Sequence, residues 1–272
     1  MIIHLKIIGT NKTHFFGIIE TVEISSDIKR MMKRMRDYKL VYEENFEVDG
    51  KPDPEVWTFE VGEKWSNNES QCYVDSLDNC YIKDGKLNLV ATIHNTPTCK
   101  YRSTRINTFK KKHFQYGKFI VRAKMPAGKG SWPAIWFLGS TKTDIRWPKC
   151  GEIDLLEFAG NRPGIVSCAI HTEAYNHKID TQIGRRKVLE TASTEFHDYN
   201  LEWTKDFLSF GIDGKEYLRI NKKKNDTFAE WPFDQPYFMI LNLAVGGWYA
   251  GEIDDKDLPY HFQIDTIKVY QE

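Results

Sequence analysis

From Tyr38 onward, apolar and polar residues alternate in short segments, and no window keeps the 3.6-residue period of a helix for more than two turns. Residues 86–92 (KLNLVAT) and 118–125 (KFIVRAKM) alternate in this way, and residues 237–245 and 263–270 have the pattern of further strands. Successive side chains of a strand point to opposite faces, so such alternation marks strands with one face buried. The chain is therefore predicted to be all-β.

The strongest local signal is a hairpin within residues 204–220, in which Asp213 and Gly214 form a two-residue turn. Asp-Gly is a pair that tolerates the positive φ angles of such turns. Many short strands with turn residues between them favour a β-jelly-roll sandwich of two antiparallel sheets. Although 272 residues would allow two domains, we expect one sandwich over residues 37–272 and an N-terminal extension over residues 1–36 that is disordered or a short helix.

The composition excludes several classes of protein. The 38 Lys and Arg residues balance 38 Asp and Glu residues, and the sequence has no long basic stripe that could neutralise a nucleic-acid backbone. No stretch approaches the roughly 18 consecutive apolar residues of a membrane span. Aromatic residues make up 14% of the chain and include eight tryptophans, more than its core requires, so some are expected to face a ligand.

The cysteines and the N-terminus bear on the cellular compartment. The cysteines are odd in number, irregularly spaced and without metal-ligand spacing, so we expect small buried thiols in a reducing compartment. They are Cys72, Cys80, Cys99, Cys150 and Cys168. Residues 1–8 are interrupted by His4 and Lys6 and are followed by no small-residue cleavage site. The absence of a clear signal peptide indicates a cytoplasmic protein or a start that lies elsewhere.

Three carboxylates, Glu152, Asp154 and Glu157, lie close together in the sequence GEIDLLEFAG. In a regular strand the first two would share a face, and Glu157 would point the other way. A one-residue bulge between Asp154 and Glu157 would return all three to one face, and bulges are common beside active sites. The apolar residues between them would then face the core.

Such a row of carboxylates is suited to glycoside hydrolysis. Two carboxyl groups about 5–5.5 Å apart can cleave a glycosidic bond with retention, one as nucleophile and the other as acid and base. Asp154, between the two glutamates, can keep their pKa values apart. A solvated acidic face or a Ca²⁺ site would also account for the three residues. The spacing does not decide which glutamate has which role.

Tryptophans flank these carboxylates. Trp132 and Trp136 share a face of a strand, and Trp147 precedes Glu152 by five residues. Each of them could equally belong to the core. Sugar rings present flat C–H faces, for which aromatic side chains supply broad apolar area, so three tryptophans beside a carboxylate row favour carbohydrate as the ligand.

The segment GEIDLLEFAG, preceded by GSWPAIWFLG and WPKC, resembles the laminarinase branch of glycoside hydrolase family 16. The resemblance runs in family order from about residue 39 to 270. Its further motifs are WSNNESQCY (65–73), DGKL (84–87), STRINT (103–108), FHDYNLEW (196–203) and WPFDQPYFMILNLAVGG (231–247). It implies a concanavalin A-like jelly roll with a substrate cleft on its concave face and a catalytic domain over residues 37–272.

The resemblance also implies residue roles. Glu152 would be the nucleophile, Glu157 the acid and base, and Asp154 the residue that tunes them. Further substrate-binding positions would be Trp132, Trp136, Trp147, Trp248, Asn67, Arg105 and His171. His171 could instead be a structural strand histidine, and Arg105 could pair with a surface acid. No cofactor is implied for catalysis, but a structural calcium would be held at Asn45, Gly85 and Asp265.

The function that the resemblance implies is retaining endo-hydrolysis of β-glucan by a monomer. The additional residue in the pattern E-x-D-x-x-E favours β-1,3 bonds of laminarin-type glucan. Alternatives are a mixed-linkage β-1,3-1,4-glucanase, a galactanase, a transglycosylase, and a carbohydrate-binding sandwich without turnover. The family is usually secreted, which contrasts with the absence of a visible signal peptide.

Overall fold

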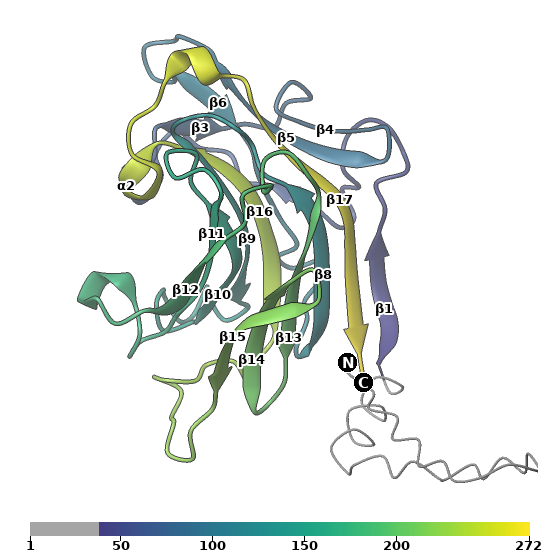
Figure 1. Ribbon diagram of the computed structural model, residues 1–272, viewed down its shortest axis with the longest axis vertical. Coiled ribbons are helices and arrows are strands. Elements are labelled where there is room, and N and C mark those ends of the chain that lie inside the picture. The colour runs from purple at the N-terminus through teal and green to yellow at the C-terminus, as the bar shows by residue number, and fades with distance from the viewer. Residues whose placement is uncertain (1–37) are drawn as a thin grey trace, which may run out of the picture. The chain divides into compact units, whose positions relative to one another are not determined.

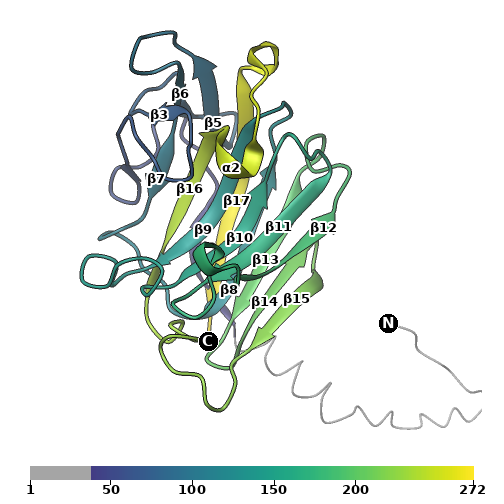
Figure 2. The same ribbon diagram turned by 90° about the vertical axis from the view of Figure 1, so that its left-hand side faces the viewer.

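The computed structural model describes residues 38–272, which form two β-sheets packed face to face (Figures 1 and 2). This arrangement confirms the predicted all-β sandwich. The predicted extension over residues 1–36 lies outside the described residues. Within the described part, no helix is long and apolar enough to cross a membrane.

The larger sheet has ten strands. They are β1 (Lys39–Glu44), β3 (Gln71–Tyr73), β4 (Cys80–Lys83), β5 (Lys86–Ile93), β6 (Tyr101–Ser103), β8 (Gly117–Lys124), β13 (His197–Trp203), β14 (Phe207–Ile212), β15 (Lys215–Asn221) and β17 (Tyr260–Gln271). Their order is β15-β14-β13-β8-β17-β5-β6-β3, with β1 paired to β17 and β4 paired to β5. Strands β3 and β6 pair in parallel, an exception to the antiparallel pairing expected of the sandwich.

The smaller sheet has seven strands and carries the candidate site. They are β2 (Thr58–Phe59), β7 (Arg105–Asn107), β9 (Ser131–Gly139), β10 (Glu152–Phe158), β11 (Ile165–His171), β12 (Ile183–Val188) and β16 (Tyr237–Val245). Their order is β12-β11-β10-β9-β16-β7-β2, so β10 and β9 are near the middle and β12 forms one edge. Helical turns are short: η1 (His177–Ile179), α2 (Gly247–Ala250) and η2 (Asp255–Asp257).

The alternation in the sequence becomes the two faces of these strands. In β9, Ile135 and Phe137 point into the core between the sheets, whereas Trp132 and Trp136 point outward. The predicted hairpin is present as β14 and β15, in which Ile212 pairs with Lys215 across the turn. Asp213 and Gly214 have φ angles of 50° and 73°, as the primed hairpin turn requires.

Core packing accounts for part of the tryptophan content. Trp57, Trp203 and Trp231 are at most 3% exposed and belong to the main hydrophobic cluster between the sheets. Their burial gives these three tryptophans a structural role. The remaining tryptophans line pockets on the outer face of the smaller sheet.

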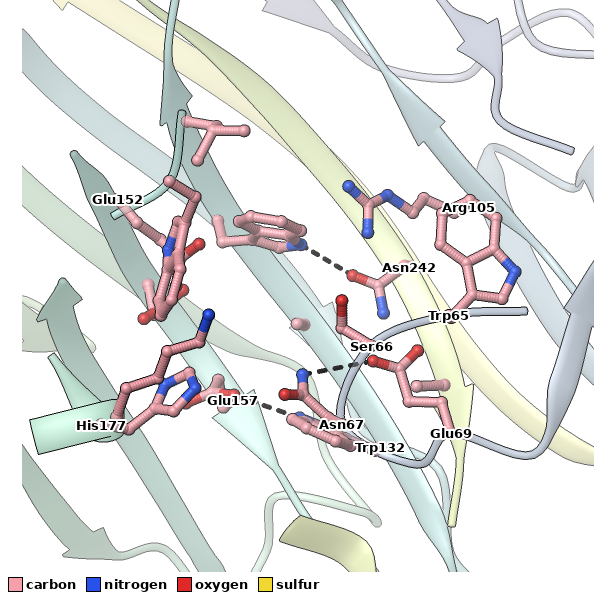
Figure 3. A pocket seen from close by; sticks show the side chains of 17 residues that line it. Trp65, Ser66, Asn67, Glu69, Arg105, Trp132, Glu152, Glu157, His177 and Asn242 are labelled. Atoms are coloured by element: carbon pink, nitrogen blue, oxygen red, sulfur yellow. Dashed lines mark hydrogen bonds between the residues drawn. The ribbon is translucent and has the colours of Figure 1, made fainter. Parts of the chain in front are cut away.

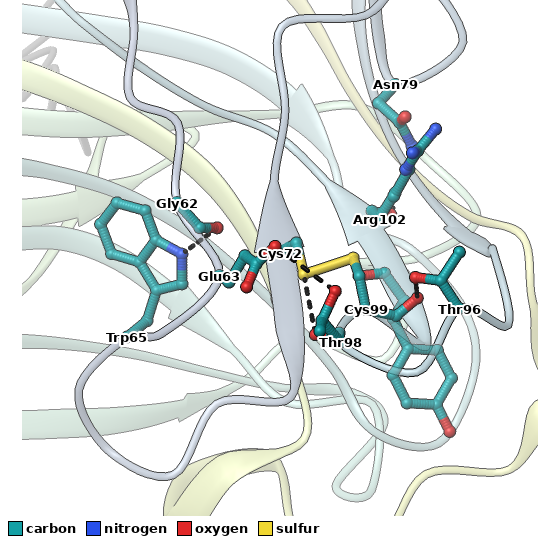
Figure 4. The surroundings of a disulfide bond; sticks show 10 residues. Gly62, Glu63, Trp65, Cys72, Asn79, Thr96, Thr98, Cys99 and Arg102 are labelled. Atoms are coloured by element: carbon teal, nitrogen blue, oxygen red, sulfur yellow. Dashed lines mark hydrogen bonds between the residues drawn. A yellow bond between two sulfur atoms is a disulfide. The ribbon is translucent and has the colours of Figure 1, made fainter.

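The expectation of five free thiols is wrong for one pair. Cys72 and Cys99 form a disulfide that links β3 to the loop before β6, across a sequence separation of 27 residues (Figure 4). The spacing of the cysteines carried no signal for it, because the parallel pairing of β3 with β6 creates the proximity. Cys80, Cys150 and Cys168 are free and buried, as predicted.

Candidate active site

Strand β10 turns three carboxylates to the outer face of the smaller sheet by means of a bulge. Asp154 pairs with Ala169 of β11 and Glu157 with Ser167, so three steps along β10 match two along β11. This is the bulge predicted between Asp154 and Glu157, and it brings Glu157 onto the face that carries Glu152. The bulge allows two consecutive residues, Leu155 and Leu156, to be buried in the core, and this apolar pair is its local cause.

The carboxylates form the floor of a pocket over β9, β16 and β7 (Figure 3). Its lining includes five of the positions expected to bind substrate: Asn67, Arg105, Trp132, Trp136 and Trp147. Figure 3 shows Trp65 and Arg105 across this pocket from Glu152. The side chains come from segments that are distant in sequence, and the strand order of the sheet gathers them.

A second pocket continues from the same carboxylates over β11 and β12. It is lined by the two remaining expected positions, His171 and Trp248, together with Tyr249. Trp248 is 74% exposed, on the short helix α2. The two pockets share their central residues, so they form one groove that passes over the carboxylates. The shared residues are Asn67, Trp132, Glu152, Asp154, Glu157, His177 and Lys178.

A network of side chains orients Glu157. The indole Nε1 of Trp132 donates a hydrogen bond to Oε1 of Glu157 at 3.1 Å. The ring of Tyr249 packs on Trp132 with centroids 5.0 Å apart, and its hydroxyl lies 2.6 Å from the hydroxyl of Ser167. The guanidinium of Arg162 lies 4.4 Å from the centre of the Tyr249 ring. Trp132 is therefore held between α2 and β10.

On the opposite side of the groove, Arg105 is fixed among aromatic rings. Its guanidinium lies 5.2 Å from the Trp65 ring and 4.8 Å from the Trp136 ring, and its Nε pairs with Glu60 at 3.0 Å. Trp136 in turn donates a hydrogen bond to Asn242 at 2.7 Å. Arg105 thus pairs with an acid, as one alternative had it, and also lines the pocket.

His171 faces the carboxylates directly. Its Nε2 lies 3.3 Å from Oδ2 of Asp154 and 3.8 Å from Oε1 of Glu152. Among the described residues, these three make up the group of acidic and histidine side chains close enough to hold a metal ion, with ligand atoms within 4.8 Å of one another. His171 thus lies against two of the three carboxylates and lines the groove with them.

Burial controls the protonation of the three carboxylates. Burial, with the charge of Asp154 second, raises the pKa of Glu152 well above its usual range. Burial and the charge of Glu157 do the same to the pKa of Asp154. Burial also raises the pKa of Glu157, against the charge of His171, the Trp132 hydrogen bond and Arg162. Burial is thus the main cause of all three shifts, and neighbouring negative charge adds to the rise in pKa at Glu152 and Asp154.

Several groove residues were not singled out from the sequence. Glu69 is a half-buried carboxylate that accepts hydrogen bonds from Asn67 and Gln71, and desolvation of the carboxylate raises its pKa. The signal that could have found it is its place inside the motif WSNNESQCY. The ring of His177 lies 5.0 Å from Trp147, with η1 reaching over the groove, and no local pattern marks that residue. Asn242 and Tyr249 also emerge only from the tertiary structure.

The three expected calcium positions are brought to one part of the larger sheet. Asn45 follows Glu44, which pairs with Ile267 of β17, while Gly85 lies two residues before Leu87, which pairs with Ile264. Asp265 lies between Ile264 and Ile267 on that strand. Its Oδ2 is 3.3 Å from Nε of Arg122. Carbonyl and carboxylate oxygens are the ligand types that calcium takes.

A two-sheet sandwich with buried carboxylates and aromatic rings along one groove defines a carbohydrate-active protein. The chain belongs to the glycosyl hydrolases family 16, whose family model matches residues 64–267. The predicted jelly-roll fold and the family resemblance are both confirmed by this match and by the solved structures that the chain resembles.

Two of these structures and one curated relative illustrate the similarity. The laminarinase from Flavobacterium sp. UMI-01 superposes with a TM-score of 0.80 at 42% identity, covering 86% of this chain and 100% of that one. SCLam, a non-specific endo-β-1,3(4)-glucanase of the same family, gives a TM-score of 0.81 at 37% identity, covering 86% and 91%. The β-glucanase of Rhodothermus marinus is 38% identical over 244 residues, which is 86% of this chain and 85% of the relative.

Proposed function

We propose that the protein is a retaining endo-β-glucanase that cleaves internal β-1,3 bonds of laminarin-type glucan. The observation that carries this proposal is the bulge in β10, which presents Glu152, Asp154 and Glu157 together at the floor of an aromatic groove. The groove continues on both sides of the carboxylates, so a polysaccharide chain can cross it. That shape supports attack at internal bonds.

The chemistry assigned to the two glutamates is double displacement. The carboxylate of Glu152 attacks the anomeric carbon while the carboxyl group of Glu157 protonates the glycosidic oxygen, and the C–O bond to the leaving sugar breaks. The Glu157 carboxylate then takes a proton from water, whose oxygen displaces Glu152 from the anomeric carbon. Two inversions give retention. These groups supply nucleophile, acid and base, so no step calls for a cofactor.

Asp154 and His171 keep these roles apart. Burial raises the pKa of Glu152 most, and a proton held on Asp154 removes the second cause, the negative charge beside it, which favours ionisation of the nucleophile. His171, 3.3 Å from Asp154, compensates charge as it develops on this row. Burial meanwhile keeps Glu157 protonated at a higher pH than an exposed glutamate, as an acid catalyst requires.

Three further assignments accompany this function. A monomer is proposed, because a single chain supplies the three carboxylates and the aromatic rings that the proposed reaction uses. A structural calcium is proposed at the carbonyls of Asn45 and Gly85 and the carboxylate of Asp265, where it would join strands rather than act in catalysis. Mixed-linkage glucan is the second candidate substrate, supported by the similarity to a non-specific β-1,3(4)-glucanase.

The test compares wild type with Glu152→Gln and Glu157→Gln on laminarin and lichenan, with release of reducing ends as the measurement. Each variant should lose at least about a hundredfold in rate, because each removes a group that acts in the transition state. Proton NMR of the first products should show the β-anomer. Wild-type rates in the Glu152→Gln variant, or α-anomeric products, would refute the assignment.

The ratio of laminarin to lichenan activity decides the linkage. A higher kcat/KM on laminarin supports β-1,3 specificity, and equal values support mixed-linkage activity. Azide separates the two glutamate roles, because it can attack the glycosyl-enzyme without base assistance. With an activated aryl β-glucoside of suitable length, azide should restore turnover in Glu157→Ala as the β-glycosyl azide and in Glu152→Ala as the α-glycosyl azide.

A further inference from the structure

The second pocket, over β11 and β12, has an unusual charge composition. Apart from the three catalytic carboxylates, its lining contains no acidic side chain. Three basic residues, Lys178, Arg185 and Arg186, line it together with His171 and His177. We call Lys178 and Arg186 the basic rim, because Arg185 pairs with the core residue Cys168 and its side chain therefore projects to the other face of β12. An uncharged glucan does not require such a rim.

The strand register places Arg186 on the same face as the acid catalyst. Glu157 of β10 pairs with Ser167 of β11, which pairs with Arg186 of β12. Residues paired across strands project to the same side of a sheet, so the three side chains form a row from the groove floor to the sheet edge. Arg186 is exposed at the end of that row.

Small residues form the groove floor between the carboxylates and the edge of the sheet. Asp154 pairs with Ala169, and Ala169 pairs with Gly184 at the edge. A Cβ atom at Gly184 would lie 2.6 Å from the carbonyl oxygen of Cys168 and 3.1 Å from Cβ of Ala169, so a larger residue does not fit there. The small side chains of Ala169 and Gly184 leave room beside Arg186 for a substituent on a bound sugar unit.

No carboxylate in the described chain neutralises the basic rim. Lys178 lies over the Trp147 ring at 4.9 Å, and Arg185 donates to the backbone carbonyl of Tyr217 at 2.9 Å. Arg186 makes neither an ion pair nor a hydrogen bond within residues 38–272, in contrast to Arg105, Arg122 and Arg219, which pair with acids. Its guanidinium is therefore free to bind an anion.

We propose that the groove over β11 and β12 binds sugar units that carry an anionic substituent, a sulfate ester or a carboxylate, with Arg186 as the main contact. The planar guanidinium offers two parallel N–H donors to such oxygens. Lys178, on η1, adds positive charge to the same pocket. This inference rests on the proposed endo-glucanase activity and extends its substrates to acidic glucans.

The experiment compares β-1,3-gluco-oligosaccharides that are neutral, 6-O-sulfated or 6-carboxylated. In wild type, cleavage should leave the charged unit always on the same side of the broken bond, as product mapping by mass spectrometry will show. Arg186→Gln should lower the ratio of kcat/KM for charged over neutral substrate by roughly five- to tenfold. Comparing the sulfated and carboxylated substrates identifies the preferred anion.

Lys187→Gln is the matched control. Lys187 is the next residue of β12, equally exposed, and points to the opposite face of the sheet. It should leave the charged-to-neutral ratio at the wild-type value. For wild type, that ratio should fall as salt rises from 0.05 to about 0.5 M, because ions screen exposed charges.

Equal ratios in wild type and Arg186→Gln, or charged units scattered on both sides of the broken bonds, would overturn the inference. Binding of the sulfated and carboxylated oligosaccharides to the Glu152→Gln variant, measured by calorimetry with and without Arg186→Gln, gives an answer that does not depend on turnover. If neutral glucan is not cleaved, the proposed endo-glucanase fails. If binding also does not respond to Arg186, the anion site fails independently.

Discussion

At the scale of single residues, Glu157 has a partner that alters its acidity without taking part in the chemistry. Trp132 donates a hydrogen bond to the carboxylate, which favours the ionised form and lowers the pKa of Glu157 against the effect of burial. Tyr249 holds the indole in place from α2. The pKa of the proposed acid catalyst is thus lowered by a tryptophan that the sequence indicated only as a sugar-binding residue.

Replacing this tryptophan should move the pH profile. In Trp132→Phe the hydrogen bond is lost, so the pKa of Glu157 rises further and the protonated acid persists to higher pH. The alkaline limb of kcat/KM against pH, which reports deprotonation of Glu157, should therefore shift to higher pH. The acid limb, which reports ionisation of Glu152, should move less. A profile series on laminarin from pH 4 to about pH 10 measures both limbs.

Trp136→Phe is the control for this prediction. Its indole lines the same groove but donates to the amide of Asn242, which does not titrate. It should weaken substrate binding and leave the alkaline limb in place. An unchanged alkaline limb in Trp132→Phe, or an equal shift in both variants, would contradict the tuning role.

At the scale of elements, the disulfide braces the segment that forms one wall of the groove. Cys72 lies in β3 beside Gln71, which donates to Glu69 at 2.8 Å and accepts from the backbone N–H of Val245 at 2.8 Å. Cys99 anchors the loop before β6 to the same strand. Strand β3 is only three residues long, so the covalent link supplies stability that its hydrogen bonds do not.

Removing the disulfide should destabilise the fold. Closing a loop of 27 residues lowers the entropy of the unfolded chain, so Cys72→Ser/Cys99→Ser should lose about 3 kcal/mol of unfolding free energy. For a domain of this size the Tm should fall by roughly 6–12 °C, measured by calorimetry. Dithiothreitol should lower the wild-type Tm and leave that of the double variant unchanged. A wild-type Tm that ignores the reductant would refute the prediction.

At the scale of the whole molecule, β17 joins the beginning and the end of the sandwich. It pairs with β1, β5 and β8, so segments from residue 39 to residue 271 meet along one strand. The three proposed calcium ligands lie where β1 ends, where β4 turns into β5, and at the bulge of β17. A cation there would connect parts of the chain that the unfolded state holds far apart.

Calcium should therefore raise the thermal stability of the whole sandwich. With free calcium at about a hundred times Kd, the gain is about 2.7 kcal/mol, and EDTA should remove it as a drop in Tm. Asp265→Asn should abolish the response. Asp198→Asn is the matched control, because Asp198 pairs with the same Arg122 and should retain the response to calcium. A wild-type Tm that is indifferent to EDTA would exclude the site.

The local pattern of the chain predicted more of the site than of its surroundings. Alternation of apolar and polar residues predicted β5, β8 and β16, and the Asp-Gly pair predicted the hairpin. The spacing of Glu152, Asp154 and Glu157 predicted the bulge that β10 contains. These features depend on neighbours within a few residues, so the sequence determines them directly.

Only the tertiary structure decided which distant residues meet at that row of carboxylates. The disulfide, the contact of Tyr249 with Trp132, and the row from Glu157 to Arg186 all depend on pairings between strands far apart in the chain. The sequence by itself determined an all-β chain with a row of three carboxylates, because periodicity and motif spacing are local, and the resemblance of its motifs implied family 16. The position of Arg186 at the edge of the groove and the disulfide between Cys72 and Cys99 depend on strand order, which long-range packing sets.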